Sequence, residues 1–218
     1  MTNNKQRKTV VQCDFDGTIT PEDISFQILD KYSRGDWRNL FKQYQNGKIS
    51  VGKFNTMAFS MVKENEETLV KFVHEKAEVR SGFIELINFF KQNNYSFIIV
   101  SNGLDFYIKT ILGDLGLEDI EFHAARTRFS GNGVDARYIG PDGKELLVGF
   151  KEAYTRLFLE NNQRLIYIGN GPSDIPSALM ADYAFATGPM LEICKQRGIN
   201  CIPFDELDDI VRGLKLLD

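Results

Sequence analysis

Val10-Val11-Gln12-Cys13-Asp14-Phe15-Asp16-Gly17-Thr18-Ile19-Thr20 is an apolar run that ends in two aspartates. The run predicts a buried strand with Asp14 and Asp16 at its carboxyl end, and Gly17 allows a tight turn directly after them. Open α/β sheets bind their ligands at that end of the strands. Two carboxylates so close in sequence repel each other unless a cation or a shared proton intervenes. The alternative is a plain Asp-Gly turn, and the rest of the chain has to decide between them.

Length and composition indicate a globular protein. The 218 residues fit one domain, or one domain with a modest insertion. The formal net charge of −4 gives no support for nucleic acid or an anionic membrane as a partner. No apolar run approaches the roughly 20 residues that span a bilayer, and the polar residues 1–9 read as a frayed tail without the apolar core of a signal peptide. We expect a soluble, cytoplasmic protein, and the sequence leaves its oligomeric state open.

The cysteines indicate a reducing compartment. Cys13, Cys194 and Cys201 have no metal-ligand spacing, and an odd number argues against a disulfide scaffold. We expect all three to be packing residues, with Cys13 on the buried strand.

Helical patterns follow the first strand as far as about residue 80. Pro21-Glu22-Asp23 is typical of a helix start, because proline and acidic residues are favoured in the first turn. Apolar residues then recur at helical spacing, with breaks at Arg34-Gly35-Asp36 and Asn46-Gly47. The pattern predicts a helical module, residues 21–80, inserted directly after the first strand. We expect its aromatic and methionine side chains to form a packing face rather than a ligand site.

Strands and helices alternate in the remainder of the chain. We expect strands at residues 95–100, 165–168, 183–186 and 200–202, separated by helical patterns. Residues 122–142 predict a β-hairpin, because glycine-rich turns interrupt a polar-apolar alternation. The alternation of strands and helices predicts a parallel sheet with helices on both faces.

Polar loops with glycines follow three of the expected strands. They contain the Asp14/Asp16 pair, Ser101-Asn102-Gly103 and the segment from Asn170 to Asp174, while Lys151 stands at a helix start before the third. Parallel strands end at one edge of the sheet, so these groups can converge. Carboxylate and amide oxygens suit Mg²⁺, whereas a hydroxyl, main-chain N–H groups and a lysine suit a phosphate dianion. This combination favours a site for Mg²⁺ and phosphate over a plain Asp-Gly turn.

The same segments resemble the four ordered motifs of the haloacid dehalogenase-like phosphohydrolases. The resemblance spans nearly the whole chain and implies a Rossmann-like α/β core of residues 1–20 and 81–218 with a helical cap of residues 21–80. The cap and the hairpin resemble those of the phosphoserine phosphatase branch. Within that branch, three segments resemble the methionine-salvage phosphatases, which act on a methylthio-ketose phosphate: residues 14–20, 57–61 and 202–205.

The resemblance implies catalytic and metal-binding roles for the motif residues. Asp14 would be the nucleophile that forms an aspartyl-phosphate, and Asp16 would protonate the leaving alcohol and then activate water. Mg²⁺ would be bound by the Asp14 carboxylate, the main-chain carbonyl of Asp16 and Asn170. Family members usually carry aspartate where this chain has Asn170, so we expect weaker metal binding. Asp174 would serve the outer shell of the metal or orient Lys151.

The phosphate would be held by Ser101, Asn102, Gly103 and Lys151. Asp23 is a candidate for substrate contact, with helix-end electrostatics as the alternative. The sequence thus predicts a Mg²⁺-dependent phosphomonoesterase for a small phosphorylated metabolite. Two alternatives stay open: a phosphatase or phosphotransferase for phosphoserine or a sugar phosphate, and a non-catalytic protein that binds phosphorylated ligands. The cap segment 54–62 has no arginine for the carboxylate of phosphoserine.

Overall fold

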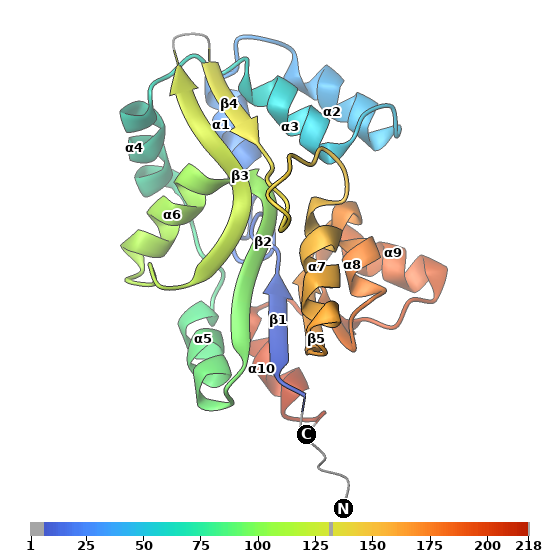
Figure 1. The fold of residues 1–218 in the computed structure, drawn as a ribbon. Helices are drawn as coiled ribbons and strands as arrows, with labels where there is room; N and C mark the ends of the chain where they lie inside the picture. The colour runs from blue at the N-terminus through green and yellow to red at the C-terminus, as the bar shows by residue number, and fades with distance from the viewer. Residues whose placement is uncertain (1–6, 131–132, 218) are drawn as a thin grey trace, which may run out of the picture.

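A seven-stranded sheet forms the centre of the molecule (Figure 1). The computed structural model describes residues 7–130 and 133–217, so most of the expected N-terminal tail and the tip of the hairpin lie outside the described residues. Neighbouring strands are parallel except for one antiparallel pair, β3 and β4. The expected parallel α/β sheet is therefore confirmed. In spatial order the strands are β4 (Gly133–Arg137), β3 (Glu121–Ser130), β2 (Ser96–Leu104), β1 (Thr9–Cys13), β5 (Arg164–Gly169), β6 (Tyr183–Ala186) and β7 (Ile202–Pro203).

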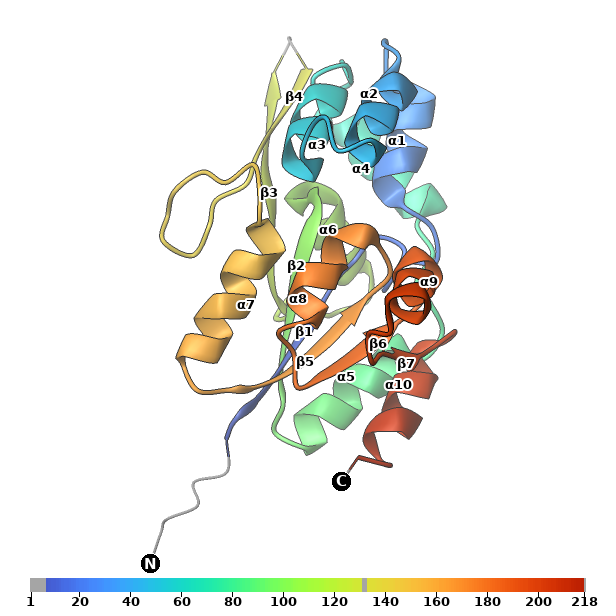
Figure 2. The ribbon, with the colours of Figure 1, turned by 90° about the vertical axis from the view of Figure 1, so that its right-hand side faces the viewer.

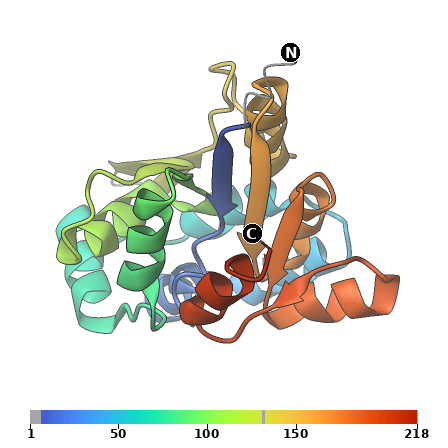
Figure 3. The same ribbon diagram turned by 90° about the horizontal axis from the view of Figure 1, so that it is seen from below.

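The first strand lies in the middle of this sheet. Val10 is in register with Ser96 of β2 on one side and with Leu165 of β5 on the other. Every residue of β1 is buried because helices cover both faces of the sheet (Figures 2 and 3). On one face α5 packs against α10, and on the other α7 packs against α8. These helices and their neighbours are α5 (Phe83–Gln92), α6 (Asp105–Asp114), α7 (Phe150–Glu160), α8 (Ile175–Ala178), α9 (Gly188–Arg197) and α10 (Leu207–Leu214).

Four helices between β1 and α5 lie beyond the carboxyl end of β1 (Figure 1). They are α1 (Ile24–Tyr32), α2 (Trp37–Gln45), α3 (Val51–Phe59) and α4 (Glu66–Lys76). Each begins after a side chain that accepts a hydrogen bond from the main-chain N–H three residues later, which satisfies a free donor of the first turn. The four capping residues are Asp23, Asp36, Ser50 and Asn65.

The hairpin of β3 and β4 extends from the sheet towards these helices. Its antiparallel pairing runs from Arg126 opposite Arg137 to Ser130 opposite Gly133, as expected from the alternation in residues 122–142. Thr56 on α3 donates a hydrogen bond of 3.2 Å to the main-chain oxygen of Ala136 on β4. The hairpin therefore connects the inserted helices to the sheet.

Two expectations from the sequence are wrong. Ser101, Asn102 and Gly103 are not a loop but part of β2, because β2 continues its pairing with β3 past a register shift as far as Leu104 opposite Ala125. Cys194 and Cys201 form a disulfide rather than acting only as packing residues, because the end of α9 returns the chain beside its own last turn, with Cα atoms 6.3 Å apart. Cys13 is free and buried, as expected. Among the described residues, no helix has both the length and the apolar character needed to cross a membrane.

Candidate active site

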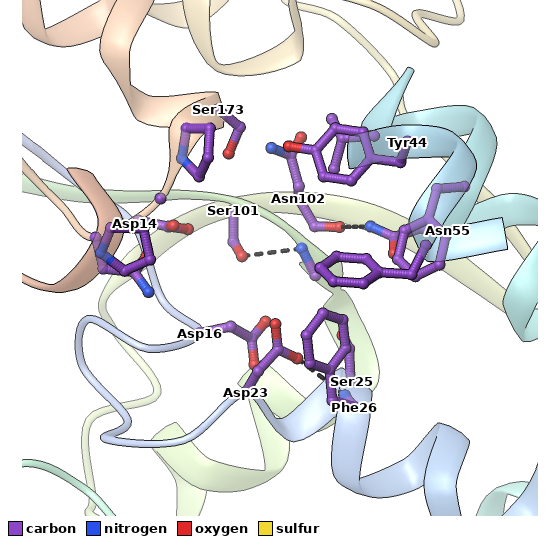
Figure 4. A pocket seen from close by; sticks show the side chains of 18 of the residues that line it. Asp14, Asp16, Asp23, Ser25, Phe26, Tyr44, Asn55, Ser101, Asn102 and Ser173 are labelled. Atoms are coloured by element: carbon purple, nitrogen blue, oxygen red, sulfur yellow. Dashed lines mark hydrogen bonds between the residues drawn. The ribbon is translucent and has the colours of Figure 1, made fainter. Parts of the chain in front are cut away.

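A cavity of about 550 Å³ lies between the carboxyl ends of the central strands and helices α1 to α3 (Figure 4). The side chains of Asp14, Asp16 and Ser101 face the same space in this view. Nearly all the predicted site residues line the cavity, and Asp174 is the exception, since it is fully buried beside it. The predicted residues in the lining are Asp14, Asp16, Asp23, Ser101, Asn102, Gly103, Lys151 and Asn170.

Lys151 connects two carboxylates beside the cavity. It lies in the first turn of α7, and its Nζ is 2.6 Å from Oδ2 of Asp14 and 2.6 Å from Oδ1 of Asp174. Burial by itself lowers the pKa of Lys151, but the charges of the two aspartates outweigh it and raise that pKa well above its usual range. Burial and the charge of Asp174 raise the pKa of Asp14 to about 7, against the lowering effect of Lys151. Lys151 is therefore a fixed positive charge beside Asp14.

Asp174 holds the loop that follows β5. Its Oδ1 accepts hydrogen bonds from Lys151 and from the hydroxyl of Tyr167, both at 2.6 Å. Its Oδ2 accepts from the main-chain N–H groups of Asn170 at 3.1 Å and Gly171 at 2.8 Å. A Cβ on Gly169 would come within 2.6 Å of the Asp174 carboxyl carbon, so only glycine fits there. Asp174 thus fixes both the Lys151 ammonium and the loop that carries Asn170.

Asp16 is held between the inserted helices and the core. Its Oδ1 accepts a hydrogen bond of 2.9 Å from the N–H of Ile24, and its Oδ2 accepts one from the hydroxyl of Tyr107. Burial and the charge of Asp23 raise the pKa of Asp16 to about 8, against the lowering effect of these hydrogen bonds. Gly17 supplies the turn after Asp16 with a φ of 72°, as the sequence predicts. A carboxyl group with this pKa can give and take a proton near neutral pH.

The segment from Ser101 to Gly103 forms one wall of the cavity. Oγ of Ser101 accepts a hydrogen bond of 2.9 Å from the N–H of Gly103. The main-chain oxygen of Asn102 accepts from Nδ2 of Asn55 on α3 at 2.7 Å and from the hydroxyl of Tyr138. The sequence does not identify Asn55 and Tyr138 as site residues, because their partner is a main-chain oxygen that is distant in sequence. They fix the peptide group between Asn102 and Gly103.

The acidic side chains around the cavity fit a hard divalent cation. Burial raises the pKa of Asp14, Asp16 and Asp23, and Lys151 is the basic side chain among the described residues of the lining. A cation beside these carboxylates would lower the cost of ionising them. The described part of the chain contains no group of three or more His, Cys, Asp or Glu side chains that could hold a metal. A metal site here would therefore need an amide or main-chain oxygen as well.

Asn170 can supply such an oxygen. Its Oδ1 accepts a hydrogen bond of 3.2 Å from the hydroxyl of Thr18, and a second lone pair on that oxygen remains for a cation. Its side chain lies against Gly17, where any side chain would collide with it. Asn170 is thereby held next to the turn that carries Asp16. A metal held by the Asp14 carboxylate, the Asn170 amide and the Asp16 carbonyl would have oxygen ligands only, which would suit Mg²⁺.

Aromatic side chains from α1 to α3 line the cavity opposite the acidic groups. Phe26 lies 4.9 Å from Phe41 and Tyr44 lies 6.1 Å from Phe54, measured between ring centroids. These four residues and Val51, together the apolar wall, belong to the lining. The rings pack against one another, as expected, and they also line the cavity. Helical periodicity identifies an apolar face but not the space in front of it.

Three comparisons place the chain among known proteins. A model of the family described as haloacid dehalogenase-like hydrolase matches residues 11–179. The chain is 29% identical to a 2-hydroxy-3-keto-5-methylthiopentenyl-1-phosphate phosphatase of Bacillus cereus (strain ATCC 14579) over 211 residues, which is 95% of the chain and 96% of the relative. It is 28% identical to the protein of that name from Bacillus mycoides (strain KBAB4), again over 95% of the chain and 96% of the relative.

Solved structures of phosphoserine phosphatases have the same fold. A substrate-bound complex superposes with a TM-score of 0.71 at 20% identity and covers 96% of this chain and 99% of that one. An analogue of the phospho-aspartyl intermediate gives a TM-score of 0.69 at 19% identity, over 95% and 99% of the two chains. At these identities the likeness concerns the fold alone.

Proposed function

The chain belongs to the haloacid dehalogenase-like hydrolases, as its four motifs predict, and we propose that it is a Mg²⁺-dependent phosphomonoesterase for a small phosphate ester with an apolar tail. The observation that carries the proposal is the position of Asp14. Its carboxylate lines a cavity, 2.6 Å from the Lys151 ammonium, with Asp16 and Ser101 in the same lining. A carboxylate nucleophile, a carboxyl acid and fixed positive charge are the groups that hydrolysis of a phosphate ester requires.

In the first step an oxygen of Asp14 forms a bond to phosphorus while the bond between phosphorus and the alcohol oxygen breaks. Asp16 gives its proton to that alcohol oxygen. In the second step Asp16 takes a proton from water, whose oxygen attacks phosphorus and releases phosphate and the Asp14 carboxylate. Ser101, the amides of Asn102 and Gly103, and Lys151 hold the phosphoryl oxygens and stabilise the charge that develops on them.

The metal would be held by the Asp14 carboxylate, the main-chain carbonyl of Asp16 and the amide oxygen of Asn170. When bound, Mg²⁺ supplies positive charge that lets the anionic nucleophile approach the anionic phosphate. Asn170 brings one negative charge fewer than the aspartate that is usual in the family, so we expect weaker metal binding. Asp174 acts indirectly, by holding Lys151 and the 170–171 main chain.

Residues 21–80 act as a cap over a core formed by residues 1–20 and 81–218. Helices α1 to α3 supply the apolar wall, Asp23 precedes α1, and the core supplies Asp14, Asp16 and Lys151. The hydrogen bond from Asn55 to the main-chain oxygen of Asn102 joins cap and core next to the phosphate-binding segment. A cap in this position excludes bulk water while the phosphoryl group is transferred.

The lining of the cavity supports a phosphate ester with an apolar tail over phosphoserine. The apolar wall lies opposite Asp14 and Asp16, and Lys151 is already paired with two carboxylates. The described lining has no arginine that could pair with the carboxylate of phosphoserine. A thioether tail packs well against aromatic rings. The name of the Bacillus relatives describes a methylthio-substituted ketose phosphate, which has a phosphate at one end and such a tail at the other.

A panel of phosphate esters tests this function. Purified protein is assayed for phosphate release, with Mg²⁺ and with EDTA, from a methylthio-ketose phosphate, phosphoserine, a sugar phosphate and 4-nitrophenyl phosphate. We expect Mg²⁺-dependent release that is fastest, by kcat/KM, for the methylthio compound and is lost in Asp14→Asn. A preference for phosphoserine or the sugar phosphate would correct the substrate class. Binding of phosphate without release from any ester would support the non-catalytic alternative and overturn the enzyme proposal.

A further inference from the structure

Tyr107 places a hydroxyl group directly behind Asp16. It lies on α6 in the core, is completely buried, and packs its ring against Phe15 and Phe106. Its hydroxyl contacts Oδ2 of Asp16 and lies 2.9 Å from Oγ of Ser25, the second residue of α1. A buried tyrosine usually finds a hydrogen-bond partner for its hydroxyl. Here the two partners come from the loop after β1 and from the cap.

The directions of these hydrogen bonds follow from the chemistry of the groups. In its ionised form Asp16 can only accept, so the single proton of the Tyr107 hydroxyl goes to Oδ2 of Asp16. In the protonated form the Tyr107 hydroxyl donates to Oδ2 in the same way when the Asp16 proton lies on Oδ1. Ser25 must then be the donor in the contact with Tyr107. The chain of donors therefore runs from Ser25 through Tyr107 to Asp16. Each bond in such a chain polarises the next one.

Two donors fix the plane of the Asp16 carboxyl group. Tyr107 holds Oδ2, and the N–H of Ile24 holds Oδ1 at 2.9 Å. Each oxygen keeps a further lone pair for exchange of a proton with the leaving group or with water. Gly103 allows this arrangement, because a side chain at position 103 would collide with both the Tyr107 oxygen and Oδ2 of Asp16. The contact between the Tyr107 hydroxyl and Asp16 therefore lies beside Gly103 of the proposed phosphate-binding segment.

We propose that Tyr107, supported by Ser25, is a positioning residue that aims Asp16 at the leaving oxygen of the substrate. The inference rests on the proposed function, in which the Asp16 proton moves to the alcohol oxygen as the bond from that oxygen to phosphorus breaks. Asp14 forms its bond to phosphorus in the same step, and Tyr107 keeps its own proton. The contribution of Tyr107 therefore depends on how much the leaving group needs that proton.

Leaving groups of different basicity separate this role from a structural one. An alkoxide is a poor leaving group that requires protonation, whereas 4-nitrophenolate leaves without it. The experiment compares kcat/KM for hexyl phosphate and 4-nitrophenyl phosphate, with Mg²⁺, in the wild type, Tyr107→Phe and Ser25→Ala. Tyr154→Phe is the matched control, because it also removes a tyrosine hydroxyl, one that donates to the main-chain oxygen of Ile139 at 3.0 Å outside the cavity.

We expect Tyr107→Phe to lower kcat/KM roughly tenfold or more for hexyl phosphate and less than about threefold for 4-nitrophenyl phosphate. Ser25→Ala should show a smaller loss with the same preference, and it tests the inference even if Tyr107→Phe fails to fold. Tyr154→Phe should change both esters equally or neither. Equal losses for the two esters in Tyr107→Phe and Ser25→Ala, or no loss, would overturn the positioning role alone. A wild type without Mg²⁺-dependent turnover of either ester would overturn the proposed function together with it.

Discussion

Replacing Asp174 by asparagine should cost the protein much of its stability. The Asp174 carboxylate is completely buried and accepts four hydrogen bonds, two from Lys151 and Tyr167 and two from the main chain of Asn170 and Gly171. Asparagine keeps the shape but turns one of the two acceptor oxygens into a donor. If its NH₂ group faces the loop, the partly buried N–H groups of Asn170 and Gly171 lose their acceptor. If it faces Lys151, a buried ammonium meets a donor.

The loss can be estimated from the unsatisfied groups. A buried polar group without a partner costs about 1–3 kcal/mol, so two such groups lower the free energy of unfolding by about 2–6 kcal/mol. For a domain of this size each kcal/mol lowers Tm by about 2–4 °C, which gives a drop of roughly 5–20 °C. Thermal unfolding followed by circular dichroism measures it, without added Mg²⁺ so that metal binding does not contribute.

Asp209→Asn is the matched control for this experiment. Asp209 also accepts from two main-chain N–H groups, those of Asp205 and Glu206, and pairs with a basic side chain, Arg212. Its side chain is 30% exposed, however, so water can satisfy the groups that the substitution frees. Asp209→Asn should lower the free energy of unfolding by less than about 1 kcal/mol. If the Tm of Asp174→Asn is no lower than that of Asp209→Asn, the buried hydrogen bonds of Asp174 do not stabilise the protein as we propose.

Three further substitutions test other parts of the site. Tyr44→Ala should raise KM roughly tenfold for a phosphate with an apolar tail and leave inhibition by inorganic phosphate unchanged, because the ring belongs to the apolar wall; equal effects on both would contradict this. Asn170→Asp should lower the Mg²⁺ concentration for half-maximal activity roughly tenfold, and an unchanged concentration would remove residue 170 from the metal ligands. Burial raises the pKa of Asp23 from 3.8 to about 6, so the fold favours protonated Asp23; this stabilisation is present below pH 3.8 and is lost as pH rises through 6. Asp23→Asn keeps the helix cap but does not ionise. Its free energy of unfolding in urea should therefore rise relative to that of the wild type by about 1–3 kcal/mol between pH 4 and pH 7. A difference that stays constant over this range would refute the raised pKa.

The sequence predicts those site residues that belong to a local motif at the end of a strand or the start of a helix. Asp14 and Asp16 follow a buried strand, and the topology of a parallel sheet brings Ser101, Lys151 and Asn170 to the same edge. Strand periodicity and the position of glycines are local signals, so a single sequence contains them. The same signals gave the helices of the inserted region and the hairpin.

Residues that act through tertiary contacts were not predictable in this way. Tyr107 occupies an apolar position of a helical pattern, and only the packing of α6 against the loop after β1 brings its hydroxyl to Asp16. Asn55 has the same status, since its partner is the main-chain oxygen of Asn102. Cys194 and Cys201 pair because α9 ends where the chain returns past its last turn, which an odd number of cysteines does not reveal. In each case a single sequence does not reveal which helices, strands and loops pack against one another.

The proposed reaction requires that Asp14 receives the phosphoryl group. The most direct test mixes the enzyme with Mg²⁺ and its best ester, quenches the reaction in acid within the first turnover, reduces the product with borohydride and maps the peptides by mass spectrometry. Borohydride reduces an acyl phosphate to the alcohol, so we expect homoserine at position 14 in the wild type with substrate and none without substrate. Homoserine at another aspartate, or none at all while phosphate is released in a Mg²⁺-dependent burst, would contradict it.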